Sequence, residues 1–278
     1  MGTELPTTVE GRADLARAFE RDGFVLVPGL LAPDEVHALR EAIEAAPERD
    51  DGPNPLTLGT MRFASNLFYG SEPLQRFLVD PRVIALVTAL LGPDAWVRWD
   101  QAVWKRPGAP EFPLHQDNGY TGLDAAHLQL WVALTDMDQG NGGLVVAPGC
   151  HLVDHPHRWQ GNHVVIDEPL PTRALDARAG DVVAFSSRLP HATTPNRSDR
   201  DRLAYVAELL PLDVADPSVP WPHLVAVRDG HPVGHLEGVP TPSPPAATAP
   251  AAPSPASADG ARRGLRWWRR RPVGSGHG

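Results

Sequence analysis

Two residues of the stretch FPLHQDNGY, His115 and Asp117, are of types that bind metal ions and lie one residue apart. If this stretch ends a strand, alternation places both side chains on one face and Gln116 on the other. The chain has 12 histidines in 278 residues. About one His-x-Asp pair is expected by chance, so the pair alone does not identify a metal site. A third ligand must come from elsewhere in the chain.

A second histidine is found in SSRLPHATTPNRSDRDRLAYVAEL, where His191 closes one predicted strand and Arg202 lies on the next. Imidazole and carboxylate ligands that leave a coordination face open suit a redox-active iron site. If an organic dicarboxylate occupies that face, a guanidinium can pair with its far carboxylate through two hydrogen bonds. The alternatives are a satisfied core histidine for His191 and a surface ion pair for Arg202. For His115 and Asp117 the alternative is an exposed polar pair.

The stretch CHLVDHPHRW carries a competing cluster, formed by His151, Asp154, His155 and His157. Its spacing is loose, and no Cys-x-x-Cys or His-Glu-x-x-His pattern supports a zinc site. We therefore interpret this segment as a polar loop.

The elements that must position these residues change in character along the chain. The N-terminal part predicts a helix, a strand over residues 24–27, a Pro-Gly turn and a second helix, and PRVIALVTALLG predicts a helix between Pro81 and Gly92. From residue 95 onward, short segments rich in Val, Leu and aromatic residues alternate with Gly, Pro, Asn and Asp. This order predicts a mainly β protein with flanking helices, built as an antiparallel double-sheet barrel.

Composition divides the chain into a domain at residues 1–238 and a tail at residues 239–278. The tail begins with PTPSPPAATAPAAPSPASADG, which cannot bury a core and predicts an extended linker. It ends in ARRGLRWWRRRPVGSGHG, where six arginines surround Trp267 and Trp268. This tail is a candidate for weak contact with an anionic surface, and the alternative is a solvated tail with no dedicated role.

The net charge of −9 is unevenly distributed, because the tail carries six arginines and one acid, Asp259. The acidic body is a poor electrostatic partner for nucleic acid, so we expect none. No run of 18 apolar residues and no basic-then-apolar N-terminal segment is present. We therefore expect no membrane span and a cytoplasmic protein, and the single cysteine, Cys150, fits a reducing compartment.

Four segments together resemble a known family. RDGFVLVPGLLAPDEV, HQDNGY, LQLWVALTDMDQGNGGLVVAPGCH and PHATTPNRSDRDR, within residues 14–212, are similar to the phytanoyl-CoA dioxygenase family of Fe(II)- and 2-oxoglutarate-dependent oxygenases. The resemblance implies a double-stranded β-helix core of the jelly-roll, cupin-like type. It also implies Fe(II) ligation by His115, Asp117 and His191, and a salt bridge from Arg202 to 2-oxoglutarate.

The same resemblance implies further contacts with 2-oxoglutarate. Thr193, two residues after the distal histidine, fits a small hydroxyl position, and Trp131 and Gln101 would flank the cosubstrate. Tyr120 and Lys105 are candidates for substrate contact. The alternatives are a core tryptophan for Trp131, a brace for the loop in the case of Tyr120, and a surface lysine for Lys105.

The resemblance predicts a dioxygenase that uses Fe(II), 2-oxoglutarate and O2 to hydroxylate an aliphatic C–H bond, releasing succinate and CO2. Because Asp117 is retained, no coordination position is freed for a halide, and hydroxylation is favoured over halogenation. The expected substrate is a small metabolite or lipid-like molecule, modified by a bacterial tailoring enzyme of secondary metabolism. The alternative is a non-catalytic cupin-like protein that binds a metal or small ligand, since jelly rolls host many functions.

Overall fold

The computed structural model describes residues 9–47, 57–219 and 223–237, so the linker and the arginine-rich tail predicted at 239–278 lie outside the described residues. Within the described ranges, no helix is long and apolar enough to cross a membrane. The helices are α1 (Val9–Asp22), α2 (Pro33–Ala45), α3 (Glu72–Leu78), α4 (Pro81–Leu90) and α5 (Asn118–Thr121), with 3₁₀ turns η1 (Leu67–Gly70) and η2 (Cys150–Leu152).

The remaining regular elements are strands. They are β1 (Phe24–Val27), β2 (Thr57–Leu58), β3 (Met61–Ser65), β4 (Ala95–Lys105), β5 (Phe112–His115), β6 (Leu128–Ala133), β7 (Leu144–Val146), β8 (Arg158–Gln160), β9 (His163–Val165), β10 (Arg173–Leu175), β11 (Val182–Ser186), β12 (His191–Thr193), β13 (Arg202–Pro211), β14 (His223–Arg228) and β15 (His231–Glu237).

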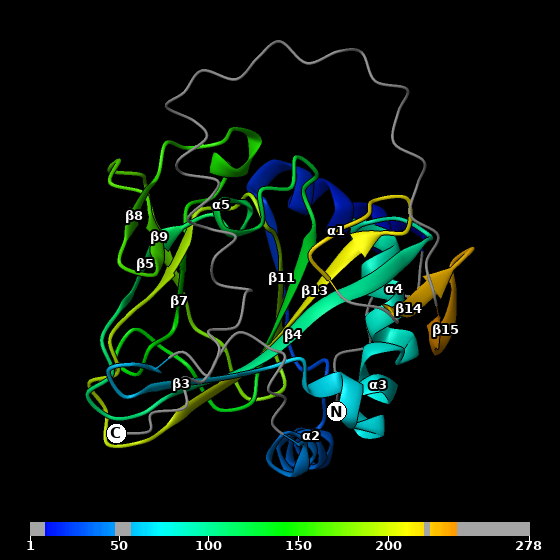
Figure 1. The fold of residues 1–278 in the computed structure, drawn as a ribbon, viewed down its shortest axis with the longest axis horizontal. Helices are drawn as coiled ribbons and strands as arrows, with labels where there is room; N and C mark the ends of the chain where they lie inside the picture. Colours follow the sequence, from blue (N-terminus) through cyan, green and yellow to red (C-terminus); the bar gives the residue numbers. More distant parts are fainter. Residues whose placement is uncertain (1–8, 48–56, 220–222, 238–278) are drawn as a thin grey trace, which may run out of the picture. The chain divides into compact units, whose positions relative to one another are not determined.

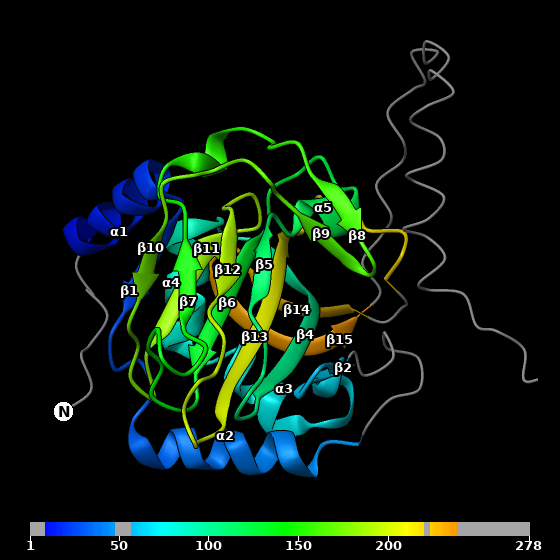
Figure 2. The same ribbon diagram turned by 90° about the vertical axis from the view of Figure 1, so that its left-hand side faces the viewer.

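The strands form two antiparallel sheets that face each other. The large sheet has the order β1-β11-β6-β13-β4-β14-β15, and β3 also pairs with β4 and carries β2. The small sheet has the order β10-β7-β12-β5, and β8 and β9 form a separate pair. Figure 2 shows the small sheet in front of the large one. This arrangement confirms the predicted double-stranded β-helix core.

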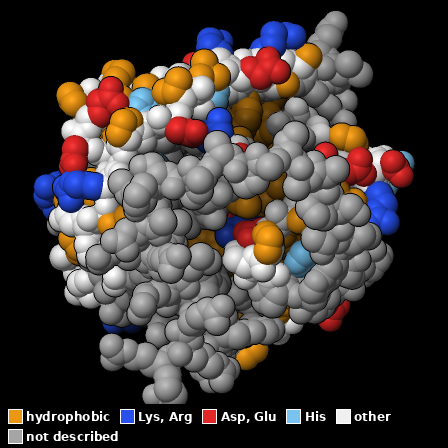
Figure 3. All heavy atoms as spheres, turned by 45° about the horizontal axis from the view of Figure 1, so that its top comes forward, with side chains coloured by type: hydrophobic (Ala, Val, Ile, Leu, Met, Phe, Trp, Pro, Cys, Tyr) orange, Lys and Arg blue, Asp and Glu red, His pale blue; other side chains and the backbone are white. Residues whose placement is uncertain are grey.

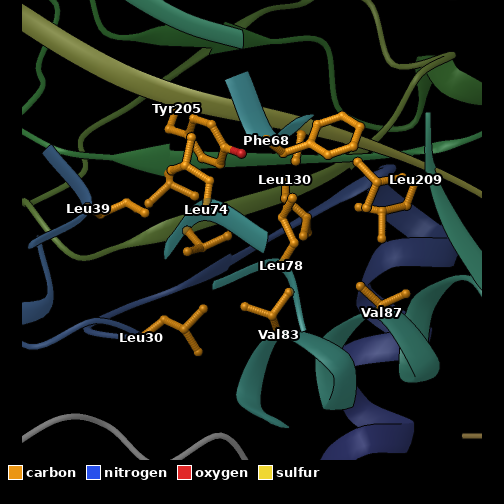
Figure 4. Packing of buried hydrophobic residues seen from close by; sticks show 14 of the residues in the cluster. Leu30, Leu39, Phe68, Leu74, Leu78, Val83, Val87, Leu130, Tyr205 and Leu209 are labelled. Carbon is orange, nitrogen blue, oxygen red and sulfur yellow. The ribbon is translucent and has the colours of Figure 1, made fainter. Parts of the chain in front are cut away.

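The two faces of the large sheet bury different sets of side chains. In β6, Leu128, Leu130 and Val132 join the core that packs against the helices, whereas Trp131 and Ala133 join the core between the sheets. Figure 1 shows helices α1 to α4 on the side of the large sheet away from the small one. Figure 4 shows this helix-facing core; it labels Leu30, Leu39, Phe68, Leu74, Leu78, Val83, Val87, Leu130, Tyr205 and Leu209.

The helix α2 forms as its sequence pattern predicts. Val36, Leu39 and Ile43 recur at helical spacing and are buried on one face. Glu35 accepts a hydrogen bond from the backbone N–H of Ala32 at 2.8 Å, which satisfies a donor at the start of the helix. The predicted strand at residues 24–27 and the predicted helix after Pro81 are also confirmed.

The hairpin of β14 and β15 was not predicted from the sequence. Asp229 and Gly230 form its turn with φ angles of 50° and 75°, and Arg228 pairs with His231 across it. A two-residue turn with positive φ at both positions matches the twist of antiparallel strands, and Asp-Gly favours it. The signal was therefore present in the sequence.

Candidate metal and cosubstrate site

Three side chains from separate segments converge between the two sheets. One ligand atom from each of His115, Asp117 and His191 lies within 4.8 Å of the others. Among the described residues, these three form the group that could hold a metal ion. The Nε2 atoms of His115 and His191 lie 3.5 and 3.9 Å from the two carboxylate oxygens of Asp117. Two imidazoles and one carboxylate form a donor set that leaves coordination positions open.

Backbone carbonyl groups orient both imidazole rings. Nδ1 of His115 lies 2.8 Å from the carbonyl oxygen of Pro113, and Nδ1 of His191 lies 3.0 Å from that of Leu189. Because a carbonyl oxygen accepts only, each Nδ1 must carry the proton. Each Nε2 therefore presents its lone pair toward Asp117, as a metal ligand must.

The protonation states of His191 and Asp117 also suit a metal. Burial, helped by the nearby His115, lowers the pKa of His191 to about 4, so the ring is neutral at neutral pH. Burial alone would raise the pKa of Asp117, but the two histidines outweigh this effect and lower it to about 2. A neutral imidazole and an ionised carboxylate are the forms that bind metal ions.

The local structure differs from the prediction at two of these residues. The strand β5 ends at His115, and Asp117 has helical φ and ψ angles of −64° and −31° at the start of α5. The Asn118 side chain donates to the carbonyl oxygens of Leu123 and Ala125, which holds this short helix against the following loop. The prediction that His191 closes a strand is also wrong, since His191 begins β12.

The competing histidine cluster does not gather a metal site among the described residues. His155 contacts Glu168 through Nδ1 at 2.9 Å and the carbonyl oxygen of Cys150 through Nε2 at 3.0 Å. Nδ1 of His157 contacts the carbonyl oxygen of His155 at 2.8 Å. These contacts agree with the interpretation of the segment as a polar loop.

Two cations lie side by side at one end of the space between the sheets. Arg202 and Lys105 are cross-strand partners and are both fully buried. Nζ of Lys105 donates to Oγ1 of Thr193 at 2.7 Å and to the carbonyl oxygen of Thr194. The Nε and Nη2 atoms of Arg202 have no hydrogen-bond partner in the described part of the chain.

Burial makes these two positive charges costly. Burial, together with the charge of Arg202, lowers the pKa of Lys105 to about 7. Burial also lowers the pKa of Arg202 to about 9. A buried pair of like charges is stabilised when an anion binds between them. The alternative that Lys105 is a surface lysine is therefore wrong. The contacts of Lys105 favour a role in binding the cosubstrate over a role in binding the substrate.

Gly142 makes the buried position of Lys105 sterically possible. Its φ angle is 97°, and a Cβ atom there would overlap Cδ of Lys105 and approach the carbonyl oxygen of Thr194 to 3.4 Å. We expect Gly142→Ala to lower the free energy of unfolding by about 1 to 3 kcal/mol, as measured by urea denaturation. Gly140→Ala, in the same loop and facing only a side-chain oxygen of Asp138, is the control and should change it by less than about 0.5 kcal/mol. Equal losses in the two variants would contradict the steric argument.

The remaining predicted site residues surround the same space. The guanidinium of Arg202 lies 5.7 Å from the ring centroid of Trp131. Gln101 donates to Oγ of Ser65 at 3.0 Å. The Tyr120 hydroxyl accepts from the backbone N–H of Val164 at 3.0 Å, so it braces β9.

Tyr120 also contacts a candidate ligand. Its ring lies 5.6 Å from that of His115 and 5.8 Å from that of Trp159. The helix α5, which carries Tyr120, lies on the upper side of the molecule in Figure 1. Figure 3 turns that side forward and shows a recess with mainly hydrophobic walls and charged side chains around it.

Sequence analysis missed a second set of polar residues between the sheets. Gln129 and His127 are each 1% exposed, yet neither side chain has a hydrogen-bond partner among the residues described. Trp99 likewise has an unpartnered Nε1. The available signal was the alternation in HLQLWVAL, where a histidine and a glutamine share the face of Trp131.

A comparison with known protein families identifies the chain. The family model described as phytanoyl-CoA dioxygenase (PhyH) matches residues 19–204. The chain belongs to the phytanoyl-CoA dioxygenase family. All three candidate metal ligands and Arg202 lie inside the matched range.

The curated relatives include phytanoyl-CoA dioxygenases and ectoine dioxygenases. The chain is 25% identical over 217 residues to the peroxisomal phytanoyl-CoA dioxygenase of Rattus norvegicus, covering 67% of this chain and 64% of the relative. It is 30% identical over 154 residues to the ectoine dioxygenase of Bordetella parapertussis, covering 50% of this chain and 49% of the relative. The chain thus spans less than two thirds of the length of these relatives.

Among solved structures, the chain is similar to the non-heme alpha ketoglutarate dependent epimerase SnoN from nogalamycin biosynthesis. The identity is 24%, the TM-score is 0.66, and the match covers 84% of this chain and 100% of SnoN. This likeness shows that the two share the fold. SnoN has also been solved with Fe3+, alpha ketoglutarate and nogalamycin RO. The family and the His-Asp-His donor set fit Fe(II), 2-oxoglutarate and O2 as cofactor and cosubstrates.

Proposed function

We propose that the chain is an Fe(II)- and 2-oxoglutarate-dependent dioxygenase that hydroxylates an aliphatic C–H bond of a small molecule. In this reaction, one oxygen atom of O2 enters the new hydroxyl group and the other enters succinate, with release of CO2. The observation that carries the proposal is the convergence of His115, Asp117 and His191 in a space that also holds two buried cations.

The metal would be held by Nε2 of both histidines and by the carboxylate of Asp117. When bound, Fe(II) supplies the activation of O2 that no side chain can supply. The chain's own contribution is to fix the donors: Nδ1 contacts with backbone carbonyls orient both rings, and burial keeps His191 neutral.

The cations would bind the carboxylate of 2-oxoglutarate that lies away from the metal. Arg202 offers unpartnered N–H groups there, and Lys105 and Thr193 stand beside it. The strand β12 links the two ends, because His191 and Thr193 are its first and last residues. Trp131 and Gln101 would form the walls of this cosubstrate space, and Tyr120 would contact the substrate beside His115.

The test of this function is an anaerobic titration of Fe(II) and then 2-oxoglutarate into the purified protein. Chelation of Fe(II) by the keto acid gives a visible charge-transfer band, and we expect a saturable band that is absent in His191→Ala. With air admitted, slow succinate release without substrate is expected. A folded, metal-loaded protein that gives no band would instead support the non-catalytic binding protein.

Hydroxylation is tested by isotope labelling once a substrate is found. In ¹⁸O₂, the product is expected to carry one ¹⁸O atom, and the succinate is expected to carry another. A product of unchanged mass, as from epimerisation, or one lacking two hydrogens, as from desaturation, would contradict hydroxylation while leaving the cofactor assignment intact.

A further inference from the structure

A row of side chains leads away from the candidate metal site across the inner face of the large sheet. Phe185 on β11 is opposite Gln129 on β6, Gln129 is opposite Glu208 on β13, and Glu208 is opposite Trp99 on β4. The ring of Phe185 lies 4.7 Å from that of His191, between centroids. The row therefore begins at a candidate metal ligand.

This row is separate from the two cations of the cosubstrate end. Arg202 and Glu208 point the same way from β13 and are six residues apart, which corresponds to roughly 20 Å along a strand. Lys105 and Trp99 are spaced equally on β4. A molecule held by the row would thus approach the candidate metal from the side away from Arg202.

Polar groups in and beside the row have unmet hydrogen-bonding capacity. Both amide atoms of Gln129 and Nε1 of Trp99 are buried without a hydrogen-bond partner in the ranges that the structure describes. His127 lies on the same face two residues before Gln129, with Nε2 3.6 Å from a carboxylate oxygen of Glu208. Buried polar groups are costly when unpaired, so a ligand that pairs them is favoured.

The charged groups near the row already form ion pairs with one another. Arg98 donates to Glu208 and to Asp216, each at 2.6 Å, and all three side chains are buried. The guanidinium is thus occupied by two carboxylates. An anionic substrate group would meet these acids rather than a free cation, which argues against a substrate charge placed here.

We propose that the substrate is a neutral, hydroxyl-rich molecule, such as a sugar ring or polyol, whose hydroxyl groups bind Gln129, His127 and Trp99. This inference rests on the proposed function, and it replaces the lipid-like substrate considered from the sequence. A hydroxyl group both donates and accepts, so it can pair with an indole N–H, an amide and an imidazole. An alkyl chain would leave all of these groups unpaired, and sites built for hydroxyls discriminate strongly against analogues lacking them.

The first test is binding to the Fe(II)- and 2-oxoglutarate-loaded protein without O2. The hydroxylated probes are myo-inositol and the methyl glycosides of common hexoses and 6-deoxyhexoses, and the alkyl probe is the uncharged ester methyl dodecanoate. We expect hydroxylated probes to shift the charge-transfer band saturably and Gln129→Leu to weaken their binding about tenfold or more. The affinity for 2-oxoglutarate should change less than twofold.

The second test needs no ligand. Gln129→Leu removes two unpartnered polar atoms, so the melting temperature of the free protein should stay unchanged or rise by about 2 to 4 °C. Gln75→Leu is the control, since it removes a hydrogen bond to the carbonyl oxygen of Phe68, and it should lower the melting temperature.

Three outcomes would overturn the inference. They are a shift of the band by methyl dodecanoate alone, no shift by any probe, and a loss of stability in Gln129→Leu as large as that in Gln75→Leu. Loss of the charge-transfer band itself would count against the proposed function, and the stability comparison would still test the role of Gln129.

Discussion

Asp117→Ala is expected to abolish turnover of 2-oxoglutarate. The substitution removes the one anionic donor and leaves a metal ion between two imidazoles. Loss of groups that merely support metal ligands costs about 10- to 100-fold in affinity, so loss of a ligand should weaken Fe(II) binding by more than about 100-fold. Fe(II) affinity, the charge-transfer band and succinate release measure the effect.

The design must separate metal binding from folding. Asp199→Ala, at an exposed position, is the matched control and should retain activity. In Asp117→Ala, the melting temperature of the metal-free protein should remain close to that of the wild type, while the increase caused by Fe(II) disappears. Full activity in Asp117→Ala would exclude the assignment of this residue as a ligand.

Arg202→Ala is expected to weaken binding of 2-oxoglutarate by about 2 to 5 kcal/mol, which corresponds to roughly 30-fold or more. The buried guanidinium would pair directly with the carboxylate of 2-oxoglutarate that lies away from the metal. The structure records no contact between this guanidinium and the three candidate metal ligands. Fe(II) affinity should therefore change less than threefold. Equal losses of Fe(II) and 2-oxoglutarate binding would make Arg202 a structural residue.

Lys105→Met adds a dependence on pH to the same experiment. The pKa of Lys105 falls from 10.5 to about 7 because of burial, so the wild-type affinity for a dianion should fall as the pH rises above about 7. Lys105→Met should flatten this profile. Between about pH 7 and 10.5 the unfolded chain holds a proton that the folded chain lacks, so wild-type stability should rise with pH there. A pH profile of binding unchanged by Lys105→Met would contradict the assignment.

The parts of the fold that the sequence predicts are those where local and global preferences agree. The strand at Phe24 is a short run of aromatic, Val and Leu residues, and the helices that begin at Pro33 and Pro81 have helical periodicity and a proline in their first turns. Asp117 shows the opposite case. Alternation along a strand predicted its direction, but the backbone N–H of Asp117 donates to the carbonyl oxygen of Ser187, a residue distant in the sequence, at the point where the chain turns into α5.

The sequence predicted some residues of the candidate site and missed others, for a related reason. Metal ligands are recognisable by residue type, and three of them are brought within 4.8 Å. Gln129 and His127 are ordinary polar residues in a strand, and their importance appears only when neighbouring strands leave their side chains unpaired. The burial of Lys105 depends on Gly142, which approaches it from a separate loop.

Lys105 is the single lysine of the 278-residue chain, and its amino group is enclosed beside Arg202. An amine-directed acylating reagent would therefore have one side-chain target, besides the amino terminus. Its rate of modification would report how often the cosubstrate end of the barrel opens to solvent. The protein thus carries a built-in chemical reporter of local opening, which 2-oxoglutarate should protect.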